Sequence, residues 1–313
     1  MRRRHALFAV FLLSTPLACG DAATPPPATE VVSGVQVFVD ETRSTPPNAE
    51  FEGAADRTIE TRIWLTTRPQ AQRPACGGPR CALVLLAHGF GGNTGRLDAL
   101  GRGLARAGYV VAATRFPLTN DAAPGGHASG LGDTVEQPAD LSFVISELLR
   151  SQRDDGGLLE GRIDPSRIAV LGHSLGGATA IAQTRFDCCT DERVDAAVLV
   201  APVTAVAEGV FQETTPAEGP PTLVLSGSED PVVRPAEPTA FYDRIAAPRV
   251  QVLLEGADHV DLIENVGPAA PIHDRTVDLV VAFLDRFSSG ASGLVEVLDG
   301  LARDGHTVRS DGL

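Results

Sequence analysis

The chain is 313 residues long and 43% hydrophobic, so it can bury one large core. Its formal net charge is −14, and all 26 of its basic residues are arginine. Nucleic acids bind to basic surfaces, which neutralise their phosphates, so this acidic composition argues against a nucleic-acid partner.

The first 20 residues predict an export signal. Arg2–Arg4 form a positive region, and Ala6–Leu17 form an apolar run that is too short to span a bilayer. The next residues, Leu17-Ala18-Cys19-Gly20, resemble the lipobox of bacterial lipoproteins, although Pro16 stands where that motif usually has leucine. Either Cys19 carries a lipid anchor, or the signal is cleaved at an ordinary site such as the one after Ala22. Both alternatives predict an extracytoplasmic protein that touches a membrane only through such an anchor.

The remaining chain divides into three parts by composition. Residues 21–48 are rich in proline and predict a flexible tether. Residues 49–290 contain long apolar segments and predict one folded domain. Residues 291–313 form a C-terminal tail that could contain a helix.

Within residues 49–290, apolar runs of strand length alternate with helical patterns. The expected strands are Arg57–Thr67, Cys81–Ala87, Tyr109–Ala113, Arg167–Leu171, Ala196–Ala201, Thr222–Ser226 and Val250–Leu254. The expected helices are Leu97–Ala107, Pro138–Arg150, Gly177–Gln183, Pro238–Ile245 and Asp274–Phe287. This alternation predicts an α/β fold, with a mostly parallel sheet covered by helices on both faces.

Four cysteines remain after Cys19, and disulfides are expected in an oxidising compartment. Cys76 and Cys81 are the favoured pair, because they bracket a short loop. A bond between the adjacent Cys188 and Cys189 is the least expected pairing, since consecutive α-carbons lie closer than disulfides usually require. A zinc site is the alternative use, but no histidine stands at ligand spacing from either pair.

The first informative strand end is the turn His88-Gly89-Phe90-Gly91-Gly92, which follows the strand expected at Cys81–Ala87. Function collects at the carboxyl ends of parallel strands, and these glycines let backbone N–H groups point into a pocket. The N–H of Phe90 is therefore a candidate donor to an oxyanion. His88 is expected to hold the turn by a hydrogen bond.

The second strand end carries a candidate nucleophile. Gly172-His173-Ser174-Leu175-Gly176 follows an apolar strand and precedes a helix rich in small residues. A serine on such a corner needs residues without bulk two places before and two places after it, and Gly172 and Gly176 meet that need. We expect Ser174 to be the nucleophile and the N–H of Leu175 to be the second oxyanion donor.

A serine nucleophile needs a base, and the chain offers seven histidines. His259 is preferred because it follows the strand Val250–Leu254 after a short turn, which would direct it toward Ser174. The others lie in the signal, beside the two turns already described, in loops or in the tail, namely His5, His88, His173, His127, His273 and His306.

The acid is expected on the turn after Thr222–Ser226. Asp230 is preferred because a residue before proline is pushed toward an extended conformation, which keeps it on the loop. Glu229 is the fallback, and Asp258 is more consistent with a solvated loop carboxylate. The resulting order along the chain is serine, acid, histidine.

These segments together resemble the α/β-hydrolase superfamily over about Pro79–Phe287. They are most similar to the branch with dienelactone-hydrolase-like, platelet-activating-factor-acetylhydrolase-like and polyester-hydrolase (cutinase-like) enzymes. The segments that carry the resemblance are His88–Gly92, Ile163–Gly177, Gly227–Asp230 and Gly256–His259.

The resemblance implies a carboxylic ester hydrolase that uses a Ser-His-Asp triad, forms an acyl-enzyme and requires no metal or organic cofactor. A thioesterase, an acyltransferase or a peptidase could use the same triad, and a non-catalytic binding module could use the same scaffold.

The resemblance leaves the ester open, small molecule or polymer, and the oligomeric state is not predicted. No substantial lid is apparent between Ala201 and Pro221, which favours an open pocket. The segments Phe116–Thr119, Ala123–Gly126 and Gln137–Asp140 also resemble a pattern of this branch. This loop either shapes the pocket or is a structural crossover.

Overall fold

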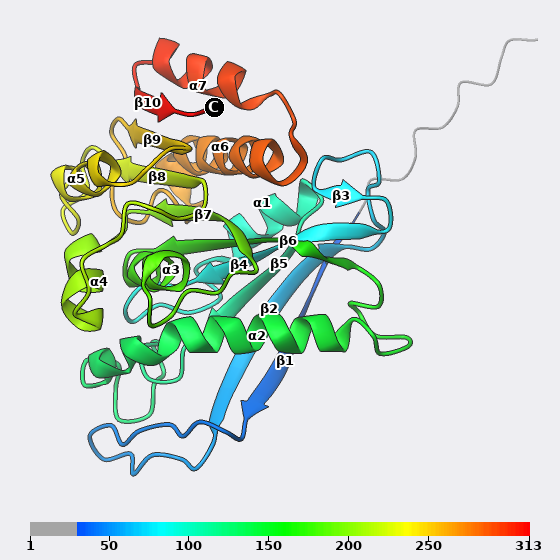
Figure 1. Ribbon diagram of the computed structural model, residues 1–313, viewed down its shortest axis with the longest axis vertical. Coiled ribbons are helices and arrows are strands. Elements are labelled where there is room, and N and C mark those ends of the chain that lie inside the picture. The colour runs from blue at the N-terminus through cyan, green and yellow to red at the C-terminus, as the bar shows by residue number, and fades with distance from the viewer. Residues whose placement is uncertain (1–29) are drawn as a thin grey trace, which may run out of the picture.

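The computed structural model describes residues 30–313, and one sheet organises them (Figure 1). Its strands are β1 Val31–Asp40, β2 Arg57–Thr66, β3 Cys76–Gly77, β4 Arg80–Ala87, β5 Val110–Arg115, β6 Ile163–His173, β7 Val194–Val200, β8 Thr222–Gly227, β9 Arg249–Leu254 and β10 Thr307–Asp311. The helices are α1 Asp98–Arg106, α2 Gln137–Ser151, α3 Leu175–Arg185, α4 Thr204–Phe211, α5 Ala236–Arg244, α6 Ala270–Ser289 and α7 Leu294–Arg303, with short 3₁₀ turns η1 Gly130–Glu136 and η2 Gly267–Ala269.

The strand order in the sheet is β1-β2-β5-β4-β6-β7-β8-β9-β10, and β3 pairs with β4. The pairs from β5 through β9 are parallel, whereas β1, β2 and β10 join antiparallel at the two edges. Central strands such as β4 and β6 contain continuous apolar runs because both of their faces are covered. The predicted mostly parallel α/β fold is therefore confirmed.

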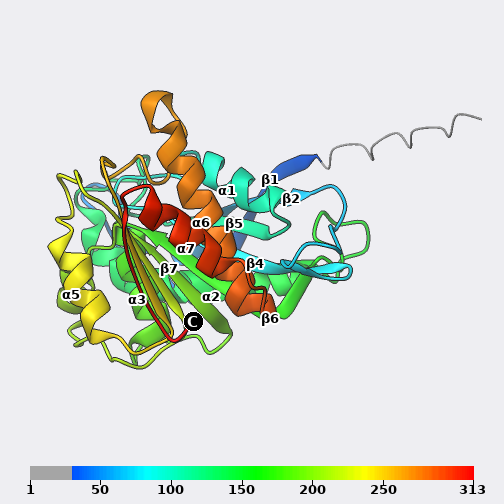
Figure 2. The same ribbon diagram turned by 90° about the horizontal axis from the view of Figure 1, so that it is seen from above.

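Helices cover both faces of this sheet, as the view from above shows (Figure 2). One core layer packs α2, α3, α4 and α5 against the sheet, and the opposite layer packs α1, α6 and α7. The helix α3, which follows β6, is buried along its whole length. This burial fixes the corner between β6 and α3, where the candidate nucleophile lies.

The tether predicted over residues 21–48 is wrong from Val31 onward, because β1 pairs antiparallel with β2 along ten residues. Phe38 on β1 is buried in the core, so this strand is an integral part of the sheet. The prolines on either side concealed it in the sequence. The predicted signal, including Cys19, lies outside the described residues.

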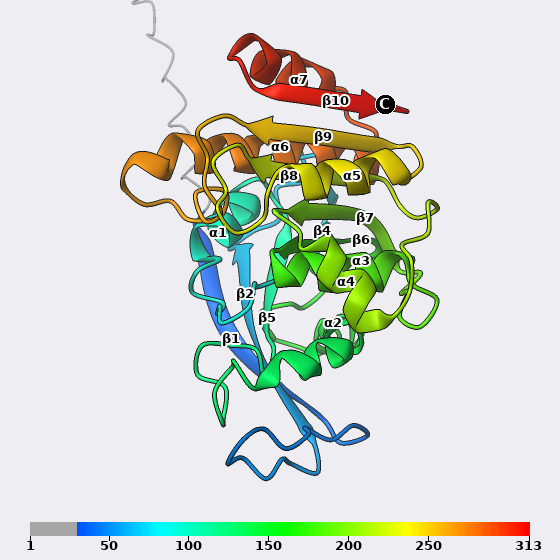
Figure 3. The same cartoon turned by 90° about the vertical axis from the view of Figure 1, so that its left-hand side faces the viewer.

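The C-terminal tail predicted over residues 291–313 also belongs to the fold. The helix α7, which the prediction allowed, packs its leucines into the core beside α6, and β10 pairs with β9 at the far edge of the sheet (Figure 3). The helix α4, between β7 and β8, was not predicted. Among residues 30–313, no helix has both the length and the apolar character that a membrane span requires.

Two disulfides are present among the described cysteines. Cys76 and Cys81 lie opposite each other in the β3–β4 pair, 3.9 Å apart at their α-carbons, and are bonded as expected. Cys188 and Cys189 are also bonded, so the prediction that disfavoured this pairing is wrong. The α-carbons of the two cysteines are 3.7 Å apart, which is closer than most disulfides allow. Both residues lie in the turn after α3, where the bond forms in spite of this short separation.

Candidate active site

The corner between β6 and α3 has the strained backbone expected of a nucleophile elbow. Ser174 has φ 54° and ψ −116°, in a region that residues with side chains rarely occupy. A Cβ on Gly172 would lie 2.0 Å from the carbonyl oxygen of Gly176, and one on Gly176 would lie 2.1 Å from that of Ala87. Glycine is therefore required at both positions, and the tight turn places Ser174 at the carboxyl end of β6.

The structure brings Asp230 and His259 into contact from two neighbouring strand ends. Asp230 follows β8 and His259 follows β9, and Asp230 Oδ2 lies 2.7 Å from His259 Nδ1. The other oxygen, Oδ1, accepts the N–H groups of Val232 and Val233, each at 2.8 Å. The Asp230 carboxylate is only 1% exposed and is held rigidly by these bonds. It orients the imidazole with a proton on Nδ1 and leaves Nε2 available.

The two alternative acids do not contact His259. Glu229 is exposed, and its backbone N–H binds the carbonyl of Ala257. Asp258 uses its carboxylate within its own loop, where Oδ1 accepts the N–H groups of Val260 and Asp261. The geometry therefore favours Asp230 over both of them.

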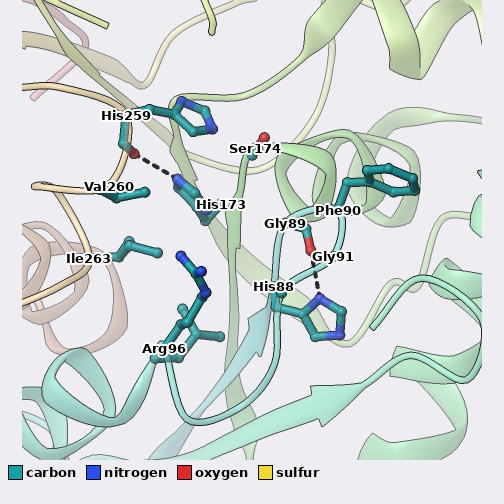
Figure 4. A pocket seen from close by; sticks show the side chains of 12 residues that line it. His88, Gly89, Phe90, Gly91, Arg96, His173, Ser174, His259, Val260 and Ile263 are labelled. Carbon is teal, nitrogen blue, oxygen red and sulfur yellow. Dashed lines mark hydrogen bonds between the residues drawn. The ribbon is translucent and has the colours of Figure 1, made fainter. Parts of the chain in front are cut away.

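His173 holds the loop of His259 beside the elbow (Figure 4). Its Nε2–H donates to the carbonyl oxygen of His259 at 2.9 Å, and the two ring centroids are 4.7 Å apart. Burial lowers the pKa of His173 to about 4, so its ring is neutral near pH 7 and serves as a fixed donor. Ser174 and His259 border the same pocket, and no hydrogen bond joins their side chains in the part of the chain that the structure describes. Such bonds often tighten only when substrate binds.

The turn after β4 presents backbone donors to this pocket. Within residues 30–313, the N–H groups of Phe90 and Leu175 have no acceptor, and Leu175 is the first residue of α3. His88 stabilises the turn, because its Nδ1–H donates to the carbonyl of Gly89 at 2.8 Å and its Nε2 accepts the N–H of Phe116 at 3.1 Å. Burial lowers the pKa of His88 to about 4, which keeps this ring neutral as well.

The pocket itself has a volume of about 170 Å³. Its walls include Leu97, Val260 and Ile263, three apolar side chains that the sequence patterns did not single out. Arg96 also borders it and forms an ion pair with Glu264 at 3.0 Å. These residues come from the loop before α1 and from the loop after β9, so only the packing of those two loops identifies them as neighbours. Across residues 30–313, no group of three or more potential metal ligands is present.

Comparisons with known proteins identify the family and the fold of the chain. A family described as PETase: PET hydrolase-like matches residues 70–291. Among solved structures, a ferulic acid esterase from Streptomyces cinnamoneus superposes with a TM-score of 0.67 at 22% identity, covering 92% of this chain and 98% of that one. At this identity the likeness shows the shared fold. No curated protein sequence matches the chain.

Proposed function

The chain belongs to the PET hydrolase-like family of α/β-hydrolases and is a carboxylic ester hydrolase, and we propose that it acts through a Ser174–His259–Asp230 triad. The observation that carries the proposal is the Asp230–His259 hydrogen bond over the pocket that also contains the strained Ser174. A triad is recognised by such geometry and not by sequence position.

The reaction proceeds in two acyl-transfer steps. His259 Nε2 takes the proton of the Ser174 hydroxyl as its oxygen attacks the ester carbonyl, and the resulting oxyanion accepts the N–H groups of Phe90 and Leu175. His259 then donates the proton to the departing alcohol, which leaves an acyl-enzyme. A water molecule, deprotonated by His259, then attacks the acyl carbonyl, the bond to Ser174 Oγ breaks, and His259 returns the proton to Ser174 as the acid leaves. Asp230 stabilises the imidazolium in both steps.

The acyl side of the substrate is proposed to be small or aromatic and uncharged. The pocket of about 170 Å³ and its apolar wall residues Leu97, Val260 and Ile263 support this assignment. Membership of a PET hydrolase-like family makes polymeric esters a candidate beside small ones.

The proposed location is extracytoplasmic, because disulfides such as Cys76–Cys81 persist in oxidising compartments. We place the catalytic domain from Glu30 to the end of the chain, preceded by the signal and a short tether. Lipidation at Cys19 remains our proposal for anchoring. Labelled palmitate should enter the wild-type protein and not Cys19→Ser, and label in both would contradict it.

The triad is tested with p-nitrophenyl esters of graded chain length and a fluorophosphonate probe. Ser174→Ala should lose hydrolysis and labelling, whereas Ser146→Ala, on the exposed face of α2, should keep both. Equal hydrolysis by Ser174→Ala and the wild type would overturn the mechanism. A wild-type protein that neither cleaves esters nor reacts with the probe would instead be a binding module on this scaffold.

A further inference from the structure

Gln137, the first residue of α2, is completely buried, and both ends of its amide are hydrogen-bonded. Its Oε1 accepts the hydroxyl of Thr179, and its Nε2 donates to the hydroxyl of Thr119 at 2.8 Å. Both threonines are fully buried as well. A buried amide whose oxygen and nitrogen are both hydrogen-bonded is held in one orientation. Because its two partners lie on different segments, Gln137 joins two parts of the chain that are distant in sequence.

The Thr119 side of this bridge leads to the oxyanion turn. The carbonyl oxygen of Thr119 accepts the N–H of Gly91 at 2.8 Å, and Gly91 directly follows Phe90. Next to this bond, Gly92 and Asn120 form a parallel bridge. The turn that carries the Phe90 N–H therefore rests on the segment to which Gln137 is bonded.

The Thr179 side leads to the other oxyanion donor. Thr179 lies one turn into α3, and its hydroxyl is also 3.3 Å from the carbonyl oxygen of Leu175. Leu175 supplies the second candidate N–H at the start of that helix. Gln137 thus connects the two segments whose donors must point at the same oxygen.

The start of α2 is anchored to the sheet by a buried ion cluster. Arg57 on β2 is fully buried and binds Asp140 at 2.6 Å and Asp133 at 2.8 Å. Asp140 lies one turn after Gln137, and Asp133 lies in the preceding η1 turn. This cluster gives Gln137 a fixed position from which to hold its two partners.

We propose that Gln137 is a positioning residue that sets the separation between the Phe90 and Leu175 N–H groups, an inference that rests on the proposed ester hydrolysis. Oxyanion donors work only within a narrow range of distances, and displacement of about 1 Å can cost about 100-fold in rate. The segments Phe116–Thr119 and Gln137–Asp140 then have a defined role, since they form the support behind the oxyanion turn.

The primary test compares Gln137→Leu with Gln183→Leu. Gln183 is an equally buried glutamine on α3 that reaches α2 through Ser142 and contacts no part of the oxyanion turn. We expect Gln137→Leu to lower kcat by about 10- to 100-fold with KM nearly unchanged, because the loss falls on the transition state. Gln183→Leu removes one long hydrogen bond of 3.4 Å and a buried oxygen without a partner among the described residues, so it should keep its kcat.

A second pair of variants tests the same link without changing Gln137. Thr119→Val removes the hydroxyl at nearly constant volume and should reproduce the fall in kcat. Thr119→Ser keeps the hydroxyl that Gln137 binds and should keep the kcat of the wild type. An alkylboronic acid forms an adduct with Ser174 that places an oxygen between the two donors. Its affinity should therefore fall in Gln137→Leu and Thr119→Val, in parallel with the fall in kcat.

The inference is overturned if Gln137→Leu keeps kcat within twofold, or if Gln137→Leu and Gln183→Leu lose kcat equally. It is also overturned if Thr119→Ser behaves like Thr119→Val. These outcomes are distinct from failure of the proposed function, which would appear as undiminished hydrolysis by Ser174→Ala.

Discussion

Asp230 is the residue whose chemistry the geometry defines most closely. One carboxylate oxygen binds two backbone N–H groups, so the other is directed at His259 Nδ1. Asp230→Asn keeps this shape but presents an amide that favours the wrong imidazole tautomer. We expect kcat to fall by about 10³- to 10⁴-fold, with little change in KM. Steady-state kinetics on a p-nitrophenyl ester measures both.

The matched control for that change is Glu229→Gln. Glu229 is adjacent in sequence and exposed, and its side chain does not contact His259. It should therefore retain the kcat of the wild type. If the two variants lost activity equally, Asp230 would not be the acid that orients His259.

His88 makes the stability of the protein depend on pH. Burial lowers its pKa from the ordinary 6.5 to about 4, so between these values the unfolded chain binds a proton that the folded protein does not. The free energy of unfolding should therefore rise with pH through this window and be fully present above 6.5, with a contribution on the order of 3 kcal/mol. His173 adds a second contribution of the same sign.

Urea unfolding at several pH values between 5 and 6.5 tests this dependence. In His88→Asn, one of the three buried imidazoles, His88, His173 and His273, is gone, and the slope of unfolding free energy against pH should fall by about 1 kcal/mol per pH unit. Comparison of the two proteins cancels the contribution of the carboxylates, which they share. Identical slopes would contradict the assignment.

At the scale of the element, β1 shows how a strand can be missed. Val35, Val37 and Val39 are about half exposed on its outer face, whereas Phe38 between them is buried. Exposed and buried side chains alternate along β1, but the exposed ones include three valines, so apolar and polar residues do not alternate clearly in the sequence. Flanking prolines therefore outweighed this pattern in the sequence, and only pairing with β2 defines the element.

Deletion of β1 should destabilise the whole domain. A chain that begins at Glu41 loses the burial of Phe38 and exposes the edge of β2, and its Tm should fall by roughly 5 °C or more. A chain that begins at Glu30 retains β1 and should keep the Tm of the mature protein. Equal Tm values for the two truncated chains, measured by calorimetry, would mean that β1 contributes no stability.

At the scale of the whole molecule, the net charge of −14 sets the long-range field that substrates meet. A negatively charged ester such as p-nitrophenyl hemisuccinate should be repelled at low salt. Its kcat/KM should rise severalfold as ionic strength increases from about 10 mM to about 300 mM, because screening shortens the range of repulsion. The neutral p-nitrophenyl acetate should show little change, and an equal rise for both esters would exclude this origin.

Much of this architecture was predictable because the signals are local. Continuous apolar runs mark the buried parallel strands, and the glycines around Ser174 mark a turn too tight for any side chain. Ser174, Asp230 and His259 each follow a strand that the sequence predicts. Because parallel strands end on the same edge of a sheet, the three residues were expected to lie near one another. Their catalytic roles stay predictions, although the Asp230–His259 contact is present.

The sequence by itself determined the α/β alternation, the elbow at Ser174 and the strand ends that carry the candidate triad, since steric limits and side-chain period act over a few residues. Only the tertiary structure decided that β1 completes the sheet, that Val260 and Ile263 face the pocket, and that Gln137 bridges both oxyanion segments. Those contacts join residues far apart along the chain. Packing of buried surfaces selects them, and no local pattern encodes which distant partner a side chain will meet.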